Sequence, residues 1–153
     1  MSVLQTVTGK RPKLIGTDLD GTIVAHYGFI SERTKIAFAA AHAAGIEIYF
    51  VTGRPIRWMV EIKENFNFGL GICANGAMLY DFINGNVLEE WLFSVNAQLE
   101  TVKRLREVIP PVSFATEIGE TFHREKKYVP RWDIGSDNVG VNKIEEAITA
   151  PSL

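Results

Sequence analysis

Short apolar runs alternate with helical segments along the first half of the chain. Three apolar runs, at 13–18, 46–51 and 70–74, predict strands. The run at 46–51, IEIYFV, lacks the alternation of a half-exposed strand and is typical of a strand buried on both faces. The segments between the runs, 32–44 and 55–66, predict helices. This βαβαβ order predicts a parallel sheet with right-handed crossovers.

Polar and special residues mark where the helices begin and end. Ser31 is suited to cap the first helix, Gly45 to end it, and Pro55 to open the first turn of the second helix. A third helix is predicted over 96–109, where apolar residues recur at helical spacing before Pro110 and Pro111.

The pattern changes after about residue 80. Two alternating runs, AMLYDF and VLEEWLF, flank Asn84-Gly85 and predict a hairpin with a two-residue turn. Two further short strands are predicted on either side of Gly119, and a short helix over 141–148. The change from parallel alternation to hairpin and helix predicts two domains, 1–82 and 83–153.

Composition and charge exclude several classes of protein. The 153 residues are 46% hydrophobic and 22% charged, which is typical of a globular core. Eighteen acidic against 16 basic residues give a net charge of −2, which argues against a nucleic-acid partner. The longest apolar runs fall short of the roughly 20 residues that cross a bilayer, so no membrane contact is expected. The single cysteine, Cys73, favours a reducing cytoplasm.

Two aspartates follow the first predicted strand in the stretch KLIGTDLDGTIV. Asp18 and Asp20 are two positions apart, so their carboxylates point to the same side, at the strand end where parallel sheets bind ligands. A cation or a shared proton would relieve their repulsion. A calcium loop does not fit, because Tyr27 would occupy the position of the acidic bidentate ligand. A turn with two solvated aspartates remains the alternative.

The second predicted strand ends in VTGRP. Thr52 and Gly53 precede a helix whose free N–H groups favour an anion, so a hydroxyl and an unhindered backbone there suit a phosphate. A simple helix cap is the alternative. Arg54 could reach a substrate or a cap domain, but the preferred interpretation is a surface residue with a packed stem. Asn75 with Gly76 could likewise lie near the site, but the preferred interpretation is a turn chosen for its backbone conformation.

Together DLDGT, VTGR and ANGA at three successive strand ends resemble the haloacid dehalogenase superfamily, in its Cof-like branch of capped phosphatases. Residues 11–82 are similar to the first part of that family's core, and residues 83–149 to the beginning of its inserted cap. The resemblance implies an α/β fold with a Rossmann-like three-layer parallel-sheet core and the beginning of an inserted α/β cap domain.

The resemblance also implies roles for four residues. Asp18 would be the nucleophile that becomes an aspartyl phosphate, and Asp20 the general acid and base. Mg²⁺ would bind the Asp18 carboxylate and the Asp20 backbone carbonyl, while Thr52 and Gly53 would hold the phosphoryl oxygens. The implied substrate is a small phosphate monoester, of a sugar or a nucleotide-like compound. A phosphate-binding or interaction module without catalysis is the alternative function.

The sequence departs from the family pattern after residue 82. A family lysine and a late acidic motif are expected after the cap, and the local candidates are Lys126, Lys127, Asp133 and Asp137. A proline and basic residues in KKYVPRW argue against the buried strand that the acidic motif requires, so these residues are assigned to the cap. The chain is therefore expected to be a piece of a longer enzyme, or to have its sheet completed by another chain or a second copy.

Overall fold

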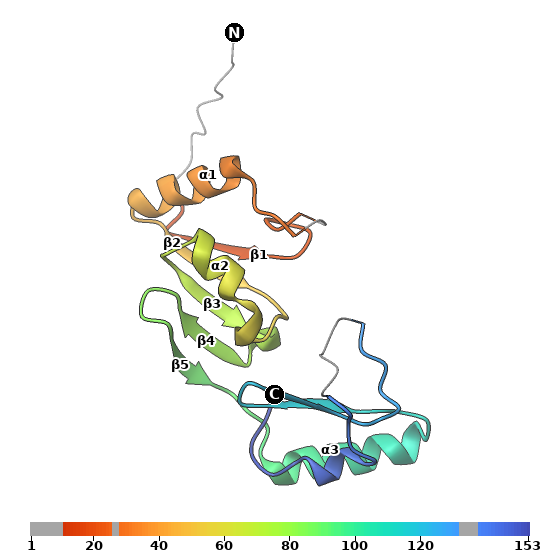
Figure 1. The fold of residues 1–153 in the computed structure, drawn as a ribbon. Coiled ribbons are helices and arrows are strands. Elements are labelled where there is room, and N and C mark those ends of the chain that lie inside the picture. Colours follow the sequence, from red (N-terminus) through yellow and green to blue (C-terminus); the bar gives the residue numbers. More distant parts are fainter. Residues whose placement is uncertain (1–10, 26–27, 132–137) are drawn as a thin grey trace.

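The computed structural model describes residues 11–25, 28–131 and 138–153. A five-stranded sheet with two helices forms one part, which we call the sheet unit, and a helix with a two-stranded hairpin forms the other, the second unit (Figure 1). The sheet unit comprises β1 (Leu14–Asp18), α1 (Glu32–Ala43), β2 (Glu47–Val51), η1 (Ile56–Trp58), α2 (Val60–Asn65), β3 (Leu70–Cys73), η2 (Ala74–Gly76), β4 (Met78–Asp81) and β5 (Asn86–Glu90). The second unit comprises α3 (Val95–Val108), β6 (Ala115–Ile118), β7 (Thr121–Arg124) and η3 (Ile144–Glu146).

The sheet runs in the order β1-β2-β3-β4-β5. Its first three strands are parallel, and β4 and β5 join antiparallel to them. The predicted α/β fold class is therefore confirmed. Among the described residues β1 has one neighbour only, β2, so it forms an edge of the sheet.

The helices of the sheet unit cover one face of the sheet. Phe50 of β2 is fully buried there, with its ring 6.1 Å from that of Phe38 in α1 and 4.9 Å from that of Phe66 after α2. Alternate positions point to the opposite face, where Leu14 is 50% and Val51 40% exposed. That second face carries no described helix, and we call it the open sheet face.

The helix boundaries follow the sequence signals only in part. As predicted, Ser31 caps α1, its hydroxyl accepting a hydrogen bond from Thr34 N at 3.1 Å. The single helix predicted over 55–66 is wrong, because the segment forms η1 and α2 with a break at Met59.

The hairpin between β4 and β5 also differs from its prediction. The connection has four residues, 82–85, instead of a two-residue turn. Asp81 organises it, because its carboxylate accepts hydrogen bonds from Ile83 N at 2.7 Å and Asn84 N at 3.2 Å. This side-chain turn competes with the tight Asn-Gly turn that the sequence favoured.

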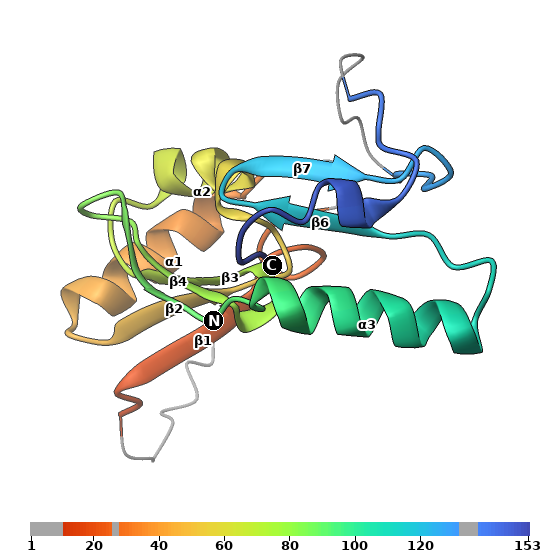
Figure 2. The same cartoon turned by 90° about the horizontal axis from the view of Figure 1, so that it is seen from below.

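The second unit packs around its own small core. Figure 2 shows α3 running along the β6–β7 hairpin, with η3 beside it. The core consists of Val102, Ile144, Ala147 and Ile148. The helix predicted over 141–148 shrinks to η3, a single 3-10 turn.

The division into domains 1–82 and 83–153 stays a prediction. The structure places β5 in the same sheet as β1–β4, and the chain leaves the sheet after Glu90. Within the described part of the chain, no helix combines the length and the apolar character needed to cross a bilayer.

Candidate active site

The turn after β1 presents the two aspartates on one side. Leu19 between them is fully buried, and its carbonyl accepts hydrogen bonds from the N–H groups of Thr22, Ile23 and Val24 at 2.9 to 3.1 Å. Because neighbouring side chains point to opposite sides, the buried Leu19 turns Asp18 and Asp20 toward solvent. The local sequence thus anchors one apolar side chain and displays two carboxylates.

The two carboxylates have different surroundings. Of the described side chains, only Thr22 hydrogen-bonds the Asp18 carboxylate, with its hydroxyl 3.4 Å from Oδ2. The Asp20 carboxylate forms an ion pair with Arg54. The Arg54 Nε lies 2.9 Å from Asp20 Oδ2, and the Arg54 Nη2 lies 2.5 Å from Asp20 Oδ1. The Asp18 carboxylate is therefore accessible to a ligand, and the Asp20 carboxylate is paired with the Arg54 guanidinium.

Arg54 belongs to the candidate site, a placement that sequence analysis considered but did not prefer. Its side chain is 17% exposed and also approaches Glu61 at 3.6 Å, so its guanidinium is paired with carboxylates and is not free at the surface. The hydrogen bonds to Asp20 raise the pKa of Arg54, partly offset by burial. The contact spans 34 positions of sequence, and no local pattern signals it.

Thr52 and Gly53 lie at the end of β2, next to the end of β1. The pairing of Asp18 with Val51 puts Thr52 beside the Asp18 turn. Thr52 is buried, and its hydroxyl accepts a hydrogen bond from Arg54 N at 3.1 Å. A Cβ on Gly53 would lie 2.9 Å from Asn75 Oδ1, so any larger residue would require the Asn75 side chain to shift.

The ANGA stretch forms the third side of the site. Ala74, Asn75 and Gly76 all have positive φ angles, of 51°, 56° and 98°. Alanine rarely adopts this conformation, which is costly and is often found at functional sites. Two hydrogen bonds hold it: Ala74 N donates to Arg54 O and Asn75 N to Thr52 O. The turn interpretation of Asn75 holds for the backbone, and the side chain also lines the cleft described next.

A cleft of about 470 Å³ opens between the sheet unit and the second unit. Its sheet-unit wall includes Asp20, Gly53, Arg54 and Asn75. Its opposite wall is provided by Thr116, Glu117, Phe122 and Tyr128 of the second unit. A ligand in this cleft would therefore contact both units, although Asp18 and Thr52 are not among the described residues that line it.

The open carboxylate fits a hard cation. Carboxylate and carbonyl oxygens are the ligands that Mg²⁺ prefers, and the Asp18–Asp20 turn offers both at an accessible position. Throughout the described ranges, no three His, Cys, Asp or Glu side chains gather into a metal-binding group. A metal here would thus depend on Asp18, on backbone oxygen, and on water or substrate.

The local candidates for the family lysine make other contacts. Lys126 Nζ donates to Asn142 Oδ1 at 2.9 Å, and Lys127 lies 3.7 Å from Glu125. Both follow β7 in the second unit, and their assignment to a cap domain stays a prediction. Asp133 and Asp137 lie outside the described residues.

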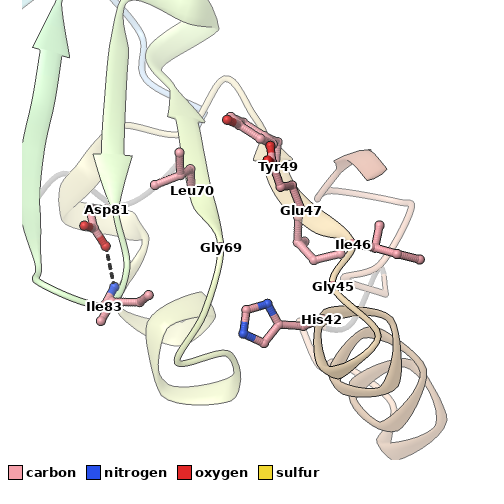
Figure 3. A pocket seen from close by; sticks show the side chains of 10 residues that line it. His42, Gly45, Ile46, Glu47, Tyr49, Gly69, Leu70, Asp81 and Ile83 are labelled. Atoms are coloured by element: carbon pink, nitrogen blue, oxygen red, sulfur yellow. Dashed lines mark hydrogen bonds between the residues drawn. The ribbon is translucent and has the colours of Figure 1, made fainter. Parts of the chain in front are cut away.

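Another cavity of about 470 Å³ lies at the opposite end of the strands (Figure 3). It is lined near the beginnings of β2 and β3 by Glu47 and Leu70, with His42 of α1 on one side and Asp81 on the other. The His42 ring stacks on Phe68 at 4.5 Å. Neither Asp18 nor Asp20 lines this cavity.

Comparisons with known proteins agree on one family. The sequence model of the haloacid dehalogenase-like hydrolases matches residues 15–147. The protein named "Putative phosphatase YxeH" of Bacillus subtilis (strain 168) is 28% identical over 131 residues, which cover 83% of this chain and 46% of that protein.

Two solved structures share the fold. BT1666 from Bacteroides thetaiotaomicron, one of the phosphatases of the haloalkanoate (HAD) enzyme superfamily, has a TM-score of 0.72 and 22% identity, over 96% of this chain and 55% of its own. BT4131, a sugar phosphatase of HAD subclass IIB, has a TM-score of 0.60 and 20% identity, over 92% of this chain and 56% of its own. The chain spans about half the length of these relatives.

Proposed function

The chain belongs to the haloacid dehalogenase-like hydrolases, and from this premise we propose that it takes part in the hydrolysis of small phosphate monoesters, with Mg²⁺ as cofactor. The family predicted from DLDGT, VTGR and ANGA is thereby confirmed. The substrates proposed are phosphorylated sugars or nucleotide-like metabolites. The sugar phosphatase among the structural relatives supports the first of these classes.

The contrast between the two aspartates carries the proposal. A nucleophilic carboxylate must be free to reach phosphorus, and Asp18 is exposed with one weak hydroxyl contact. A carboxylate that accepts a proton from water must be ionised and held in a fixed position, and the ion pair with Arg54 provides both for Asp20; to donate a proton, Asp20 must first release one oxygen from Arg54. The positions of the two side chains therefore suit the two roles.

The proposed reaction proceeds through two displacements. An Asp18 oxygen attacks phosphorus, the bond from phosphorus to the leaving oxygen breaks, and protonated Asp20 gives that oxygen its proton. Water then attacks the phosphorus of the aspartyl phosphate and loses a proton to Asp20, which releases inorganic phosphate and restores Asp18. Thr52 and the N–H of Gly53 are proposed to position the phosphoryl oxygens.

The Asp18 carboxylate and the Asp20 carbonyl would hold Mg²⁺. When bound, the ion supplies positive charge that offsets the negative charge of the transferred phosphoryl group.

Replacing the nucleophile tests this function. Asp18→Asn removes the attacking charge with little change of shape, so Mg²⁺-dependent turnover of phenyl phosphate should fall at least about 1,000-fold. Turnover would be followed by phosphate release, and phosphate binding by calorimetry. Asp81→Asn is the matched control, because that carboxylate organises the β4–β5 turn away from the cleft.

Three outcomes are distinct. Loss of turnover in Asp18→Asn with normal turnover in Asp81→Asn supports the nucleophile. Equal turnover in Asp18→Asn and the unchanged protein contradicts it. Phosphate binding without turnover in any variant favours the alternative, a non-catalytic phosphate-binding module.

A further inference from the structure

Arg57 connects the sheet unit to the second unit. It lies in η1, immediately after the loop that carries Thr52 to Arg54. Its Nη1 donates to Glu117 Oε1 of β6 at 2.6 Å, across 60 positions of sequence. Its guanidinium lies 5.0 Å from the ring centre of Trp58 in η1 and 5.9 Å from that of Phe122 in β7. One side chain thus contacts both units.

The ion pair is well shielded from solvent. The side chain of Arg57 is 23% exposed and that of Glu117 14% exposed. A pair at this depth is screened far less than one at the surface. Glu117 Oε2 is buried and accepts no hydrogen bond from the described residues, so the orientation of this carboxylate depends on Arg57.

A second cavity beside the cleft is lined by both residues of this pair. It measures about 200 Å³ and is lined by residues that include Arg57, Tyr80, Val87 and Glu117. It shares Pro55, Glu117 and Leu153 with the cleft of the candidate active site. Glu117 therefore lines both the cleft and the second cavity, and Arg57 fixes the position of its carboxylate.

We propose that the Arg57–Glu117 ion pair is a wall between the cleft and the second cavity, so that Arg57 limits the length of the leaving group. The proposal rests on the proposed phosphatase function for its substrate, and on the contacts of Arg57 for its mechanism. With the wall closed, the cleft accepts a short phosphate ester. With the wall removed, a longer leaving group extends past Pro55 into the second cavity.

Substrate selectivity is the first test. In Arg57→Ala, the ratio of kcat/KM for a disaccharide phosphate to that for phenyl phosphate should rise about tenfold, mainly through KM for the longer ester. Arg57→Lys keeps the charge but loses the planar fork, and should give an intermediate ratio. Arg104→Ala is the matched control, because it breaks an ion pair of the same 2.6 Å distance on the exposed surface of α3. An unchanged ratio in Arg57→Ala would overturn the size limit.

Hydrogen exchange separates this inference from the catalytic proposal. In the protein without substrate, amides of β6 and β7 should exchange at least about threefold faster in Arg57→Ala than in Arg104→Ala, because the contact to the sheet unit is lost. The double variant Arg57→Glu with Glu117→Arg restores an ion pair and should return exchange toward the original rate. If no variant has phosphatase activity, the proposed function fails, and the hydrogen-exchange rates of β6 and β7 alone test whether Arg57 holds the two units together. Equal exchange in all variants would overturn this inference.

Discussion

Arg54 joins the loop after β1 to the loop after β2 through its contact with Asp20. A guanidinium can hold a carboxylate with two parallel hydrogen bonds, which fixes orientation as well as distance. Glu61 of α2 approaches the same guanidinium at 3.6 Å and steadies it from the other side. If Asp20 transfers protons to and from the reacting oxygens, its placement depends on this arginine.

Substitutions at Arg54 should therefore lower the rate of the proposed reaction. Arg54→Ala frees the Asp20 carboxylate, and the misplaced proton donor should reduce kcat about 100-fold. Arg54→Lys keeps one charged contact without the planar fork and should retain more activity. Steady-state kinetics with phenyl phosphate measure both, and Arg33→Ala on the exposed surface of α1 is the control. Full kcat in Arg54→Ala would show that Asp20 needs no such support.

Sequence analysis locates the candidate site but not all of its contacts. The rule that ligands bind at the carboxyl ends of parallel strands places Asp18, Asp20, Thr52 and Gly53 at one edge, as the structure does. Their chemical roles stay predictions. The partner of Arg54 is set by tertiary structure, because the contact joins two loops whose distance no local pattern encodes.

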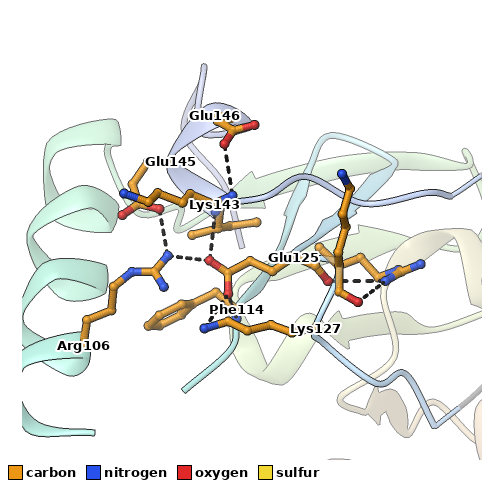
Figure 4. Close-up of polar contacts among 10 residues, drawn as sticks. Arg106, Phe114, Glu125, Lys127, Lys143, Glu145 and Glu146 are labelled. Carbon is orange, nitrogen blue, oxygen red and sulfur yellow. Dashed lines mark hydrogen bonds and ion pairs between the residues drawn. The ribbon is translucent and has the colours of Figure 1, made fainter. Parts of the chain in front are cut away.

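A buried glutamate joins three segments of the second unit (Figure 4). Glu125, directly after β7, is fully buried and pairs with Arg106 of α3. Its carboxylate also accepts hydrogen bonds from Ile144 N at 3.0 Å and Phe114 N at 3.3 Å. Burial alone would raise the pKa of Glu125, but these hydrogen bonds outweigh it and hold the pKa below its ordinary value.

Loss of this carboxylate should destabilise the second unit. Glu125→Gln removes the buried charge that pairs with Arg106, which should cost about 3 kcal/mol, near the low end for such pairs because Arg106 is 25% exposed and keeps Glu145 as a partner at 2.8 Å. Urea unfolding followed by circular dichroism measures the difference. Glu100→Gln removes an exposed partner of Arg104 and should change stability little.

The same substitution should change the response to acid. Because the pKa of Glu125 is lower in the folded state, its charge stabilises the fold above the unfolded pKa of about 4.3, and this stability is lost as pH falls through the folded pKa. Unfolding free energy should therefore fall less steeply below about pH 4.3 in Glu125→Gln than in the unchanged protein. Unfolding free energies that fall equally steeply with decreasing pH in the two proteins would contradict this role of Glu125.

Among the elements, strands are better predicted than turns. The runs at 13–18, 46–51 and 70–74 become β1, β2 and β3 with shifts of one residue at the ends. The predictions of the hairpin turn and of the last helix are wrong because single side-chain contacts determine the local structure there. Asp81 reshapes the turn, and Glu125 binds the N–H of Ile144 where η3 begins.

At the scale of the whole molecule, the described helices α1 and α2 cover one face of the sheet, and no described helix covers the other. Apolar residues of β2 and β3 point to the open sheet face, among them Tyr49, Val51, Leu70 and Ile72. The face continues to β1, whose outer edge pairs with no described strand. Glu47 N donates to Lys13 O at 2.9 Å, so the alternating pattern of a parallel ladder leaves the N–H and C=O of Gly16 facing outward.

An unprotected edge next to an apolar face favours pairing with another strand. We therefore expect the protein to associate as its concentration rises, with β1 of one copy beside β1 of another, which would complete the sheet as the sequence suggested.

A Cβ at Gly16 meets no atom within 4 Å, so Gly16→Lys adds a charge to the open sheet face without a clash. Ile36→Lys adds the same charge on α1, where the side chain is 68% exposed, and serves as control. Light scattering after size exclusion should show masses above one chain for the unchanged protein and Ile36→Lys, and a single chain for Gly16→Lys. The mass of one chain at every concentration, in all three proteins, would contradict association through this edge.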